Sequence, residues 1–188
     1  MLYLASQSPR RRQLLEQMGV DFRLLKVVIP ECPAMGETAY DYVSRVARDK
    51  ALAGFKQCPG KSVAWVLGAD TEVLLDNQVL GKPANAAAAR RMLQLLGGRS
   101  HTVLSVVWLI GADGVQCAHC FSQVRFASLD EERIATYVSS GEPFGKAGAY
   151  AIQGRGAALI AHLEGSYSGV MGLPLFETMG LLRARGLA

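Results

Sequence analysis

The pattern of apolar and polar positions along the chain predicts strands that alternate with helices. A short apolar run at Leu2–Ala5 and an apolar, partly β-branched run at Val63–Leu67 are typical of buried strands. Segments with apolar residues at helical spacing separate most of the strands. The clearest hairpin signal is the pair of β-rich runs His101–Ile110 and Val115–Phe126, joined at Gly111–Gly114. We therefore expect an α/β protein that also contains hairpins.

Capping signals mark the starts of the predicted helices. Ser8 and Pro9 are typical of an N-cap followed by proline at the first helical position. Ser128 and Glu131 have the spacing of a capping box. The predicted helices begin after Ser8, Thr38, Asn85, Ser128 and Pro174 and end near Met18, Gly54, Leu96, Ser139 and Arg185, respectively. Further extended segments are predicted at Asp21–Ile29 and Ala157–Leu163, with a hairpin at Glu72–Val79 that turns at Asp76 and Asn77.

An acidic residue closely follows the apolar run Val63–Leu67. Gly68 and Ala69 predict a turn after this strand, and Asp70 and Thr71 come next. Open α/β sheets bind their ligands at the carboxyl ends of strands, which favours a functional role for Asp70. Aspartate also caps turns and helices frequently, so this stretch alone leaves both interpretations open.

Three consecutive arginines, Arg10 to Arg12, fall in the first turn of the helix predicted after Ser8. Cations are disfavoured at the positive end of a helix, so this arrangement calls for a compensating partner. Arginines beside free backbone N–H groups form a strong anion site, and phosphate is the anion that we expect there. A solvated basic turn is the alternative.

Three lysines are further candidate ligands of an anion. Lys50 lies on the apolar stripe of the second predicted helix, where it either extends to the edge of the stripe or points into a cleft. Lys82 precedes a predicted helix N-terminus, where a phosphate would meet the ammonium and the backbone donors together. Lys146 and Gln153 are the polar candidates in the glycine-rich segment Gly141–Gly154, which matches neither common phosphate-loop motif.

Composition and charge narrow the class of protein. The chain has 188 residues, of which 50% are hydrophobic and 19% charged, as in an ordinary globular protein with one core or a core and a lobe. A net charge of +4 favours an anionic partner or substrate without separating a nucleotide from a nucleic acid. The sequence contains no apolar run long enough to span a bilayer, and the N-terminus lacks a signal-peptide pattern.

The four cysteines are sparse for a disulfide scaffold, so we expect a reducing, cytoplasmic environment. Cys117 and Cys120 have CxxC spacing, but they lie in a predicted strand, where residues three apart point to opposite faces. The sequence offers no second pair to complete a zinc site, so we interpret both as ordinary strand residues.

Six short motifs occur in the order in which they occur in the Maf (septum-formation protein-like) family of nucleoside triphosphate pyrophosphatases. They are Ser6–Arg11, Val46–Ala51, Gly68–Thr71, Gly81–Pro83, Gly141–Pro143 with Lys146–Gly154, and Gly165–Ser168 with Gly172–Pro174. Each motif alone is weak, but six in family order are specific, and they cover nearly the whole chain. The sequence therefore resembles this family.

The resemblance implies an α/β fold of the Maf/ITPase-like kind, with an elongated mixed β-sheet flanked by helices and two lobes around a central cleft. Residues 1–188 would form a single nucleotide pyrophosphatase domain. The family hydrolyses a nucleoside triphosphate to the monophosphate and pyrophosphate with a divalent metal cation, Mg²⁺ or Mn²⁺. The motifs resemble the subgroup acting on dTTP and UTP, so modified pyrimidine nucleotides are also expected substrates, and the resemblance implies a homodimer.

The resemblance also implies roles for individual residues. Asp70 would be the proton acceptor, and Arg12, Thr71 and Gln153 would determine specificity. Glu72 and Ser105 depart from the residues usual in the family at their positions.

The residues themselves suggest how a triphosphate would be held. The candidate substrate ligands are Ser8, Arg10, Arg11, Lys50, Lys82 and Lys146. Asp70 and Glu31 are the best candidates for metal ligands, because a hard divalent cation prefers carboxylate oxygens. The sequence leaves open whether Asp70 is a general base, a metal ligand or both.

Two other functions fit the same composition. A regulator that binds a nucleotide without hydrolysing it would need the same cations. A basic nucleic-acid-binding protein would also carry positive charge, but the basic residues here are scattered among loops, and no aromatic RNA-binding motif occurs in the sequence. We therefore expect a small-molecule nucleotide as substrate, with neither a stable nucleic-acid partner nor a membrane.

Overall fold

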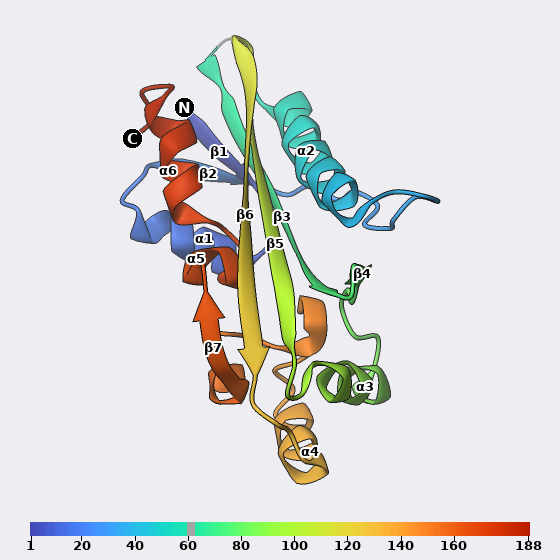
Figure 1. The fold of residues 1–188 in the computed structure, drawn as a ribbon. Coiled ribbons are helices and arrows are strands. Elements are labelled where there is room, and N and C mark those ends of the chain that lie inside the picture. Colours follow the sequence, from blue (N-terminus) through green and yellow to red (C-terminus); the bar gives the residue numbers. More distant parts are fainter. Residues whose placement is uncertain (60–62) are drawn as a thin grey trace. The chain divides into compact units, whose positions relative to one another are not determined.

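A computed structural model describes residues 1–59 and 63–188 of the chain (Figure 1). In chain order its elements are β1 (Leu2–Ala5), α1 (Pro9–Gln17), β2 (Phe22–Leu25), α2 (Ala39–Gln57), β3 (Trp65–Leu75), β4 (Gln78–Val79), α3 (Ala86–Leu96), β5 (Ser100–Gly111), β6 (Gly114–Phe126), α4 (Glu131–Ser139), the short 3-10 helices η2 (Ala147–Ala149) and η3 (Arg155–Leu159), β7 (Ile160–Glu164), α5 (Tyr167–Met171) and α6 (Leu175–Arg183). None of the helices in the described ranges is long and apolar enough to cross a lipid bilayer.

The strands of the described residues form one seven-stranded mixed sheet in the order β2-β1-β3-β5-β6-β7, with β4 paired to β3. Strand β1 pairs in parallel with both β2 and β3, whereas β4 and β7 pair antiparallel with β3 and β6. Helix α1 connects β1 to β2, as a parallel pair requires a crossover. The predicted mixed α/β sheet flanked by helices is confirmed.

The chain divides into two compact units. The first unit comprises Met1–Thr71, Ser105–Cys120 and Gly172–Ala188, and the second comprises Glu72–Leu104 and Phe121–Met171. Strands β3, β5 and β6 each contribute residues to both units. Two units agree with the two lobes implied by the family resemblance, while the central cleft stays a prediction.

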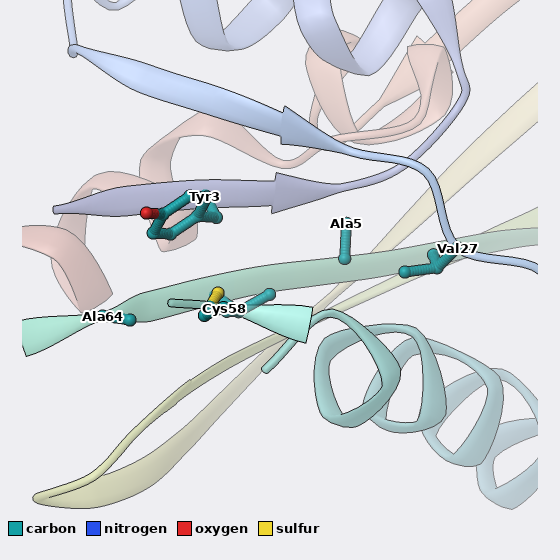
Figure 2. Packing of buried hydrophobic residues seen from close by; sticks show 6 residues of the cluster. Tyr3, Ala5, Val27, Cys58 and Ala64 are labelled. Atoms are coloured by element: carbon teal, nitrogen blue, oxygen red, sulfur yellow. The ribbon is translucent and has the colours of Figure 1, made fainter. Parts of the chain in front are cut away.

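The core of the first unit forms around β1, whose four residues are all buried. Side chains of β1 pack with residues from the segments before α2, after α2 and at the start of β3 (Figure 2). This cluster consists of Tyr3, Ala5, Val27, Cys58, Ala64 and Val66. A strand buried on both faces needs an uninterrupted apolar sequence, which explains the run at Leu2–Ala5.

Helix α2 packs closely against β3 at Gly68. A methyl group at this glycine would collide with backbone atoms of Ala47 and Ala51 on α2. Lys50 lies between these two alanines in sequence, and Asp70 lies two residues after Gly68 on β3. The absence of a side chain at Gly68 therefore brings the lysine of one element within reach of the aspartate of the other.

The turn predicted at Gly68 and Ala69 is wrong, because β3 continues through both residues to Leu75. Strand β1 pairs with β3 only as far as the contact of Leu4 with Leu67. Beyond this point β3 lacks β1 as a neighbour but remains a strand of the sheet. Asp70 thus lies inside a strand, yet past the carboxyl end of the neighbouring parallel strand.

Most of the other local predictions hold. Ser8, Thr38 and Asn85 are the N-caps of α1, α2 and α3, and each side chain accepts a backbone N–H of its helix. The hairpin turn at Asp76 and Asn77 is confirmed, with positive φ at both residues.

Several local predictions need correction. The extended segment predicted at Asp21–Ile29 is a strand only at Phe22–Leu25, β3 begins at Trp65, and α2 continues past Gly54 to Gln57. Helix α4 is capped by Asp130, whose carboxylate accepts the N–H of Arg133 at 2.8 Å, and not by Ser128. Strand β7 begins at Ile160, because the residues before it form η3. The segment between Gly165 and Gly172, for which no helix was predicted, contains the short helix α5.

A buried histidine forms part of the core of the second unit. His101 on β5 is 2% exposed, and its Nε2 lies 2.9 Å from the hydroxyl of Tyr150. Its ring makes edge contacts with Phe126 and Tyr150 at centroid distances of 5.2 and 5.4 Å. Burial lowers the pKa of His101 from 6.5 to about 4. His101 is therefore a neutral core residue, as its predicted position in a strand suggested.

The buried His101 should make stability depend on pH. Between pH 6.5 and about 4 the unfolded chain binds a proton at this histidine that the folded protein does not bind. The free energy of unfolding should therefore decrease as the pH falls through this range, by at most about 3 kcal/mol from this residue. Urea unfolding at several pH values measures the effect.

Two variants isolate the histidine from carboxylates that titrate in the same range. His101→Phe should flatten the pH dependence, whereas His162→Gln, at an exposed histidine, should leave it unchanged. The same pH dependence in all three proteins would show that burial of His101 has no effect on stability.

Candidate active site

Lys50 lies at the centre of a group of charges in the first unit. Its Nζ lies 2.8 Å from Asp70 Oδ1 and 2.6 Å from Glu31 Oε1. Lys50 and Asp70 are 8% and 6% exposed, while Glu31 lies in the loop between β2 and α2 with 34% of its side chain exposed. A charge this deeply buried needs a close partner of opposite sign, so the three groups depend on one another. Lys50 thus points inward and does not extend to the edge of its helix.

The guanidinium of Arg11 brings a second positive charge to Asp70. Its Nη2 lies 3.8 Å from Asp70 Oδ1 and 3.5 Å from the hydroxyl of Thr71. Its Nε donates to the carbonyl oxygen of Gly172 at 2.8 Å. Ser8, the N-cap of α1, accepts the backbone N–H of Arg11 and so orients the first turn of the helix. Arg11 therefore ties the start of α1 and the segment before α6 to β3.

The hydroxyl of Thr71 lies within a short chain of hydrogen bonds. It is 2.6 Å from the hydroxyl of Ser105, which is 1% exposed on β5, and it donates to Gly172 O at 3.3 Å. Because the Thr71 hydroxyl has one proton and the carbonyl can only accept, Ser105 donates to Thr71 in this arrangement. Neighbouring groups thus fix the orientation of a residue that the family resemblance assigns to specificity.

The other two arginines of α1 lie in different surroundings. Arg12 is exposed, and its Nε lies 2.7 Å from Glu16 Oε1, one turn along the helix. Burial, with a smaller contribution from the charge of Arg11, lowers the pKa of Arg10. Arg11 is the arginine that the described contacts place at Asp70.

The remaining predicted site residues, Lys82, Lys146 and Gln153, belong to the second unit. Lys82 is exposed just before α3, and Gln153 is exposed just before η3. The ammonium of Lys146 donates at 2.6 Å to a backbone carbonyl of the loop after α4. The N–H of Gly148 donates to Gly81 O at 2.8 Å, which joins the backbone segments carrying the two lysines.

No role was predicted from the sequence for Ser105, Glu142 or Gly172. Ser105 departs from the residue usual in the family, and Glu142 lies inside a quoted motif, so each carried a signal. The carboxylate of Glu142 accepts three hydrogen bonds in the second unit. The carbonyl of Gly172 could not be found from sequence, since every residue carries such a group.

The donor set around Lys50 fits a divalent cation that is completed by its substrate. Two carboxylates, Asp70 and Glu31, lie within 3 Å of the ammonium nitrogen of Lys50 and are therefore near one another. Mg²⁺ commonly takes one or two carboxylates, with phosphate oxygens and water filling its other positions. Among the described residues, groups of three or more His, Cys, Asp or Glu that could enclose a metal ion are absent. An open site is therefore the kind that these residues fit.

Comparison with known proteins places the chain in a family. The family model described as Maf-like protein matches residues 1–185. The chain belongs to the Maf-like family. This Maf-like protein therefore carries its charged Asp70 cluster on a family motif, since Gly68–Thr71 is one of the six that the sequence shares with the family.

Several relatives of this Maf-like protein match nearly their whole length. A protein named dTTP/UTP pyrophosphatase from Xanthomonas campestris pv. campestris is 54% identical, with 99% of each chain covered. A dTTP/UTP pyrophosphatase from Methylococcus capsulatus is 55% identical over 99% of this chain and 91% of the relative. A nucleoside triphosphate pyrophosphatase from Xylella fastidiosa is 51% identical over 97% of each chain.

Among solved structures, the Ham1 protein of Staphylococcus aureus is similar to this Maf-like protein with a TM-score of 0.48 and 16% sequence identity. The match covers 67% of this chain and 71% of that chain. The likeness is partial, and the family assignment comes from the sequence matches.

Removing the ammonium at the centre of the charge cluster should destabilise the fold. Lys50→Met leaves the carboxylate of Asp70 buried with Arg11 as the cation nearby at 3.8 Å. We expect the free energy of unfolding at pH 7 to fall by about 3 kcal/mol, as when one partner of a buried pair is deleted. Urea denaturation followed by circular dichroism measures the loss.

A second substitution separates lost charge compensation from lost packing. Lys50→Met combined with Asp70→Asn should recover much of the stability, since the uncompensated carboxylate is then gone. Arg12→Met, which breaks an exposed ion pair, should cost less than about 1 kcal/mol. A double variant as unstable as Lys50→Met alone would contradict the electrostatic explanation.

Proposed function

We propose that this Maf-like protein hydrolyses dTTP, UTP and modified pyrimidine nucleoside triphosphates to the monophosphate and pyrophosphate. The observation that carries the proposal is the 54% identity, over 99% of both chains, with a protein named dTTP/UTP pyrophosphatase. Such an activity would remove unwanted nucleotides from the pool used for synthesis. We propose that residues 1–188 act as one pyrophosphatase domain.

Asp70 is the proposed proton acceptor for the attacking water. Hydrolysis at the α-phosphorus requires a water molecule to lose a proton as it attacks in line with the departing pyrophosphate. Both nearby cations, Lys50 and Arg11, approach the same oxygen of Asp70, Oδ1. We therefore assign proton acceptance to Oδ2. The two cations hold the orientation of the carboxylate, which a general base needs.

Positive side chains would offset the charge of the triphosphate. Within the first unit we propose Ser8, Arg10, Arg11 and Lys50 for this role, and from the family resemblance we carry over Lys82 and Lys146. Stabilisation of charge that develops during phosphoryl transfer is usually the largest catalytic contribution. Arg11 donates through Nε to Gly172, which holds its guanidinium beside Asp70, where we propose that it contacts phosphate.

Asp70 and Glu31 are the residues that would hold Mg²⁺ or Mn²⁺, since both supply carboxylate oxygens beside Lys50. When bound, the cation would neutralise phosphate charge and lower the pKa of a coordinated water. Lys50, whose ammonium contacts both carboxylates, would orient them.

Three further properties belong to the same proposal. The family resemblance supports a homodimer. Four cysteines in 188 residues are sparse for a disulfide scaffold, and this composition supports a reducing compartment such as the cytosol. The small-molecule substrate is supported by the names of the relatives.

A substrate panel tests the activity directly. The purified full chain would be incubated with dTTP, UTP, CTP, ATP and GTP in the presence of Mg²⁺ or Mn²⁺, and released pyrophosphate would be measured. We expect dTTP and UTP to be the preferred canonical substrates. Nucleotide binding without pyrophosphate release would favour a regulator, and salt-dependent binding of DNA or RNA without release would favour a nucleic-acid-binding protein.

Asp70→Asn should lower kcat/KM for UTP by about 10²-fold or more, because the amide cannot accept the proton. The substitution keeps the size of the side chain, and circular dichroism would verify the fold. Asp76→Asn serves as the matched control, since Asp76 is an exposed residue in the turn after the same strand. Full activity in folded Asp70→Asn protein would remove Asp70 from the mechanism.

Gln153→Ala should reduce kcat/KM for UTP and dTTP by about tenfold more than for CTP, the effect of losing one or two hydrogen bonds. Uracil and thymine present a carbonyl acceptor beside an N–H donor, and the Gln153 amide offers the matching donor and acceptor. Gln94→Ala, at an exposed glutamine of α3, is the control. Equal losses for all three nucleotides would show that Gln153 does not read the base.

A further inference from the structure

Reading a pyrimidine with a glutamine amide requires the amide to be held in one orientation. Cytosine presents the reverse of the uracil pattern, and an amide free to rotate by 180° would accept either base. Gln153 is exposed and lies between Ile152 and Gly154 in the turn before η3. The backbone of this turn sets the position from which the Gln153 side chain reaches the base, so selectivity also depends on how firmly the turn is fixed.

The carboxylate of Glu142 fixes the turn on the side that follows Gln153. Its Oε2 accepts the N–H of Arg155 at 3.0 Å, and its Oε1 accepts the N–H of Gly156 at 2.9 Å. Gly154 packs directly against the same carboxylate, because any β-carbon at this position would collide with it. Glu142 thus contacts all three residues that follow Gln153 in the chain.

Tyr137 fixes the turn on the side that precedes Gln153. This residue of α4 is 5% exposed, and its hydroxyl donates to Glu142 Oε1 at 2.8 Å. The same hydroxyl accepts the N–H of Ala151 at 3.1 Å. Tyr137 and Glu142 therefore form one continuous set of hydrogen bonds that reaches the backbone both before and after Gln153.

The charge state of this network agrees with its geometry. Burial alone would raise the pKa of Glu142, but hydrogen bonds from Gly156, Arg155 and Tyr137, with the charge of Lys146, lower it below the usual value. Burial and the bond to Glu142 raise the pKa of Tyr137. At neutral pH the network therefore consists of an ionised carboxylate that accepts and a neutral phenol that donates.

We propose that Glu142 and Tyr137 are positioning residues that fix the turn Ala151–Gly156 and thereby the backbone position from which the Gln153 amide distinguishes uracil and thymine from cytosine. The proposal rests on the proposed pyrophosphatase function and assigns the base selectivity of that site to a carboxylate that does not itself contact the base.

Glu142→Gln is a sharp test because all three groups that contact the Glu142 carboxylate in this network donate a hydrogen bond to it. The amide that replaces the carboxylate has one accepting oxygen and one donating nitrogen, so at least one backbone N–H or the Tyr137 hydroxyl would face another donor. Tyr137→Phe removes the hydroxyl alone and frees the Ala151 side of the turn. Both variants keep the volume of the side chain.

The measurement is the ratio of kcat/KM for UTP to that for CTP in the full-length protein. We expect Glu142→Gln and Tyr137→Phe to lower this ratio about fivefold, approaching the value of Gln153→Ala. Asp130→Asn weakens the N-cap of α4, the helix that carries Tyr137, without touching the turn, and it should leave the ratio unchanged. Glu142→Gln added to Gln153→Ala should lower the ratio no further, since both act through the same amide.

Two results would overturn the inference. The first is an unchanged ratio in Glu142→Gln protein that hydrolyses UTP. The second is an equal decrease in Asp130→Asn, which would indicate general loosening of the second unit. The proposed function fails separately: absence of pyrophosphate release by the unaltered protein from any nucleotide would overturn both, whereas a selective unaltered protein with unaffected variants would overturn the positioning role alone.

Discussion

The arrangement of the first unit depends on a buried ammonium that two carboxylates share. The ammonium of Lys50 is buried between Asp70 and Glu31. A charge so buried is tolerated only with partners of opposite charge in close contact. Helix α2 can present this lysine because Gly68 lets it approach β3 without a side chain between them. Backbone packing and charge placement are therefore two aspects of one contact, and changing either would disturb the other.

Local signals in the sequence were sufficient for most of the fold. N-caps at Ser8, Thr38 and Asn85 have side chains that bond their own helices, so their effect is local and readable. The turn expected at Gly68 failed because its glycine serves a distant helix and not a local bend. The prediction that Ser128 caps α4 failed for a local reason, because Asp130, two residues later, caps the same helix with its carboxylate.

The charge pattern predicted the contacts of the candidate site less completely than the capping signals predicted the helices. The arginine run was readable as an anion site, but only the tertiary structure distinguishes buried Arg11 from exposed Arg12. The inward direction of Lys50 likewise follows from the packing of α2 on β3. Partners supplied by backbone, such as Gly172 O, have no residue-specific signature and could not be predicted.

Strands β3, β5 and β6 each run through both compact units without interruption. Neither unit can consequently be excised as a fragment without cutting all three strands. Such a fragment would expose unpaired N–H and C=O groups along its severed edges, the kind of surface on which chains aggregate. A truncation that keeps a single unit would therefore leave β3, β5 and β6 incomplete.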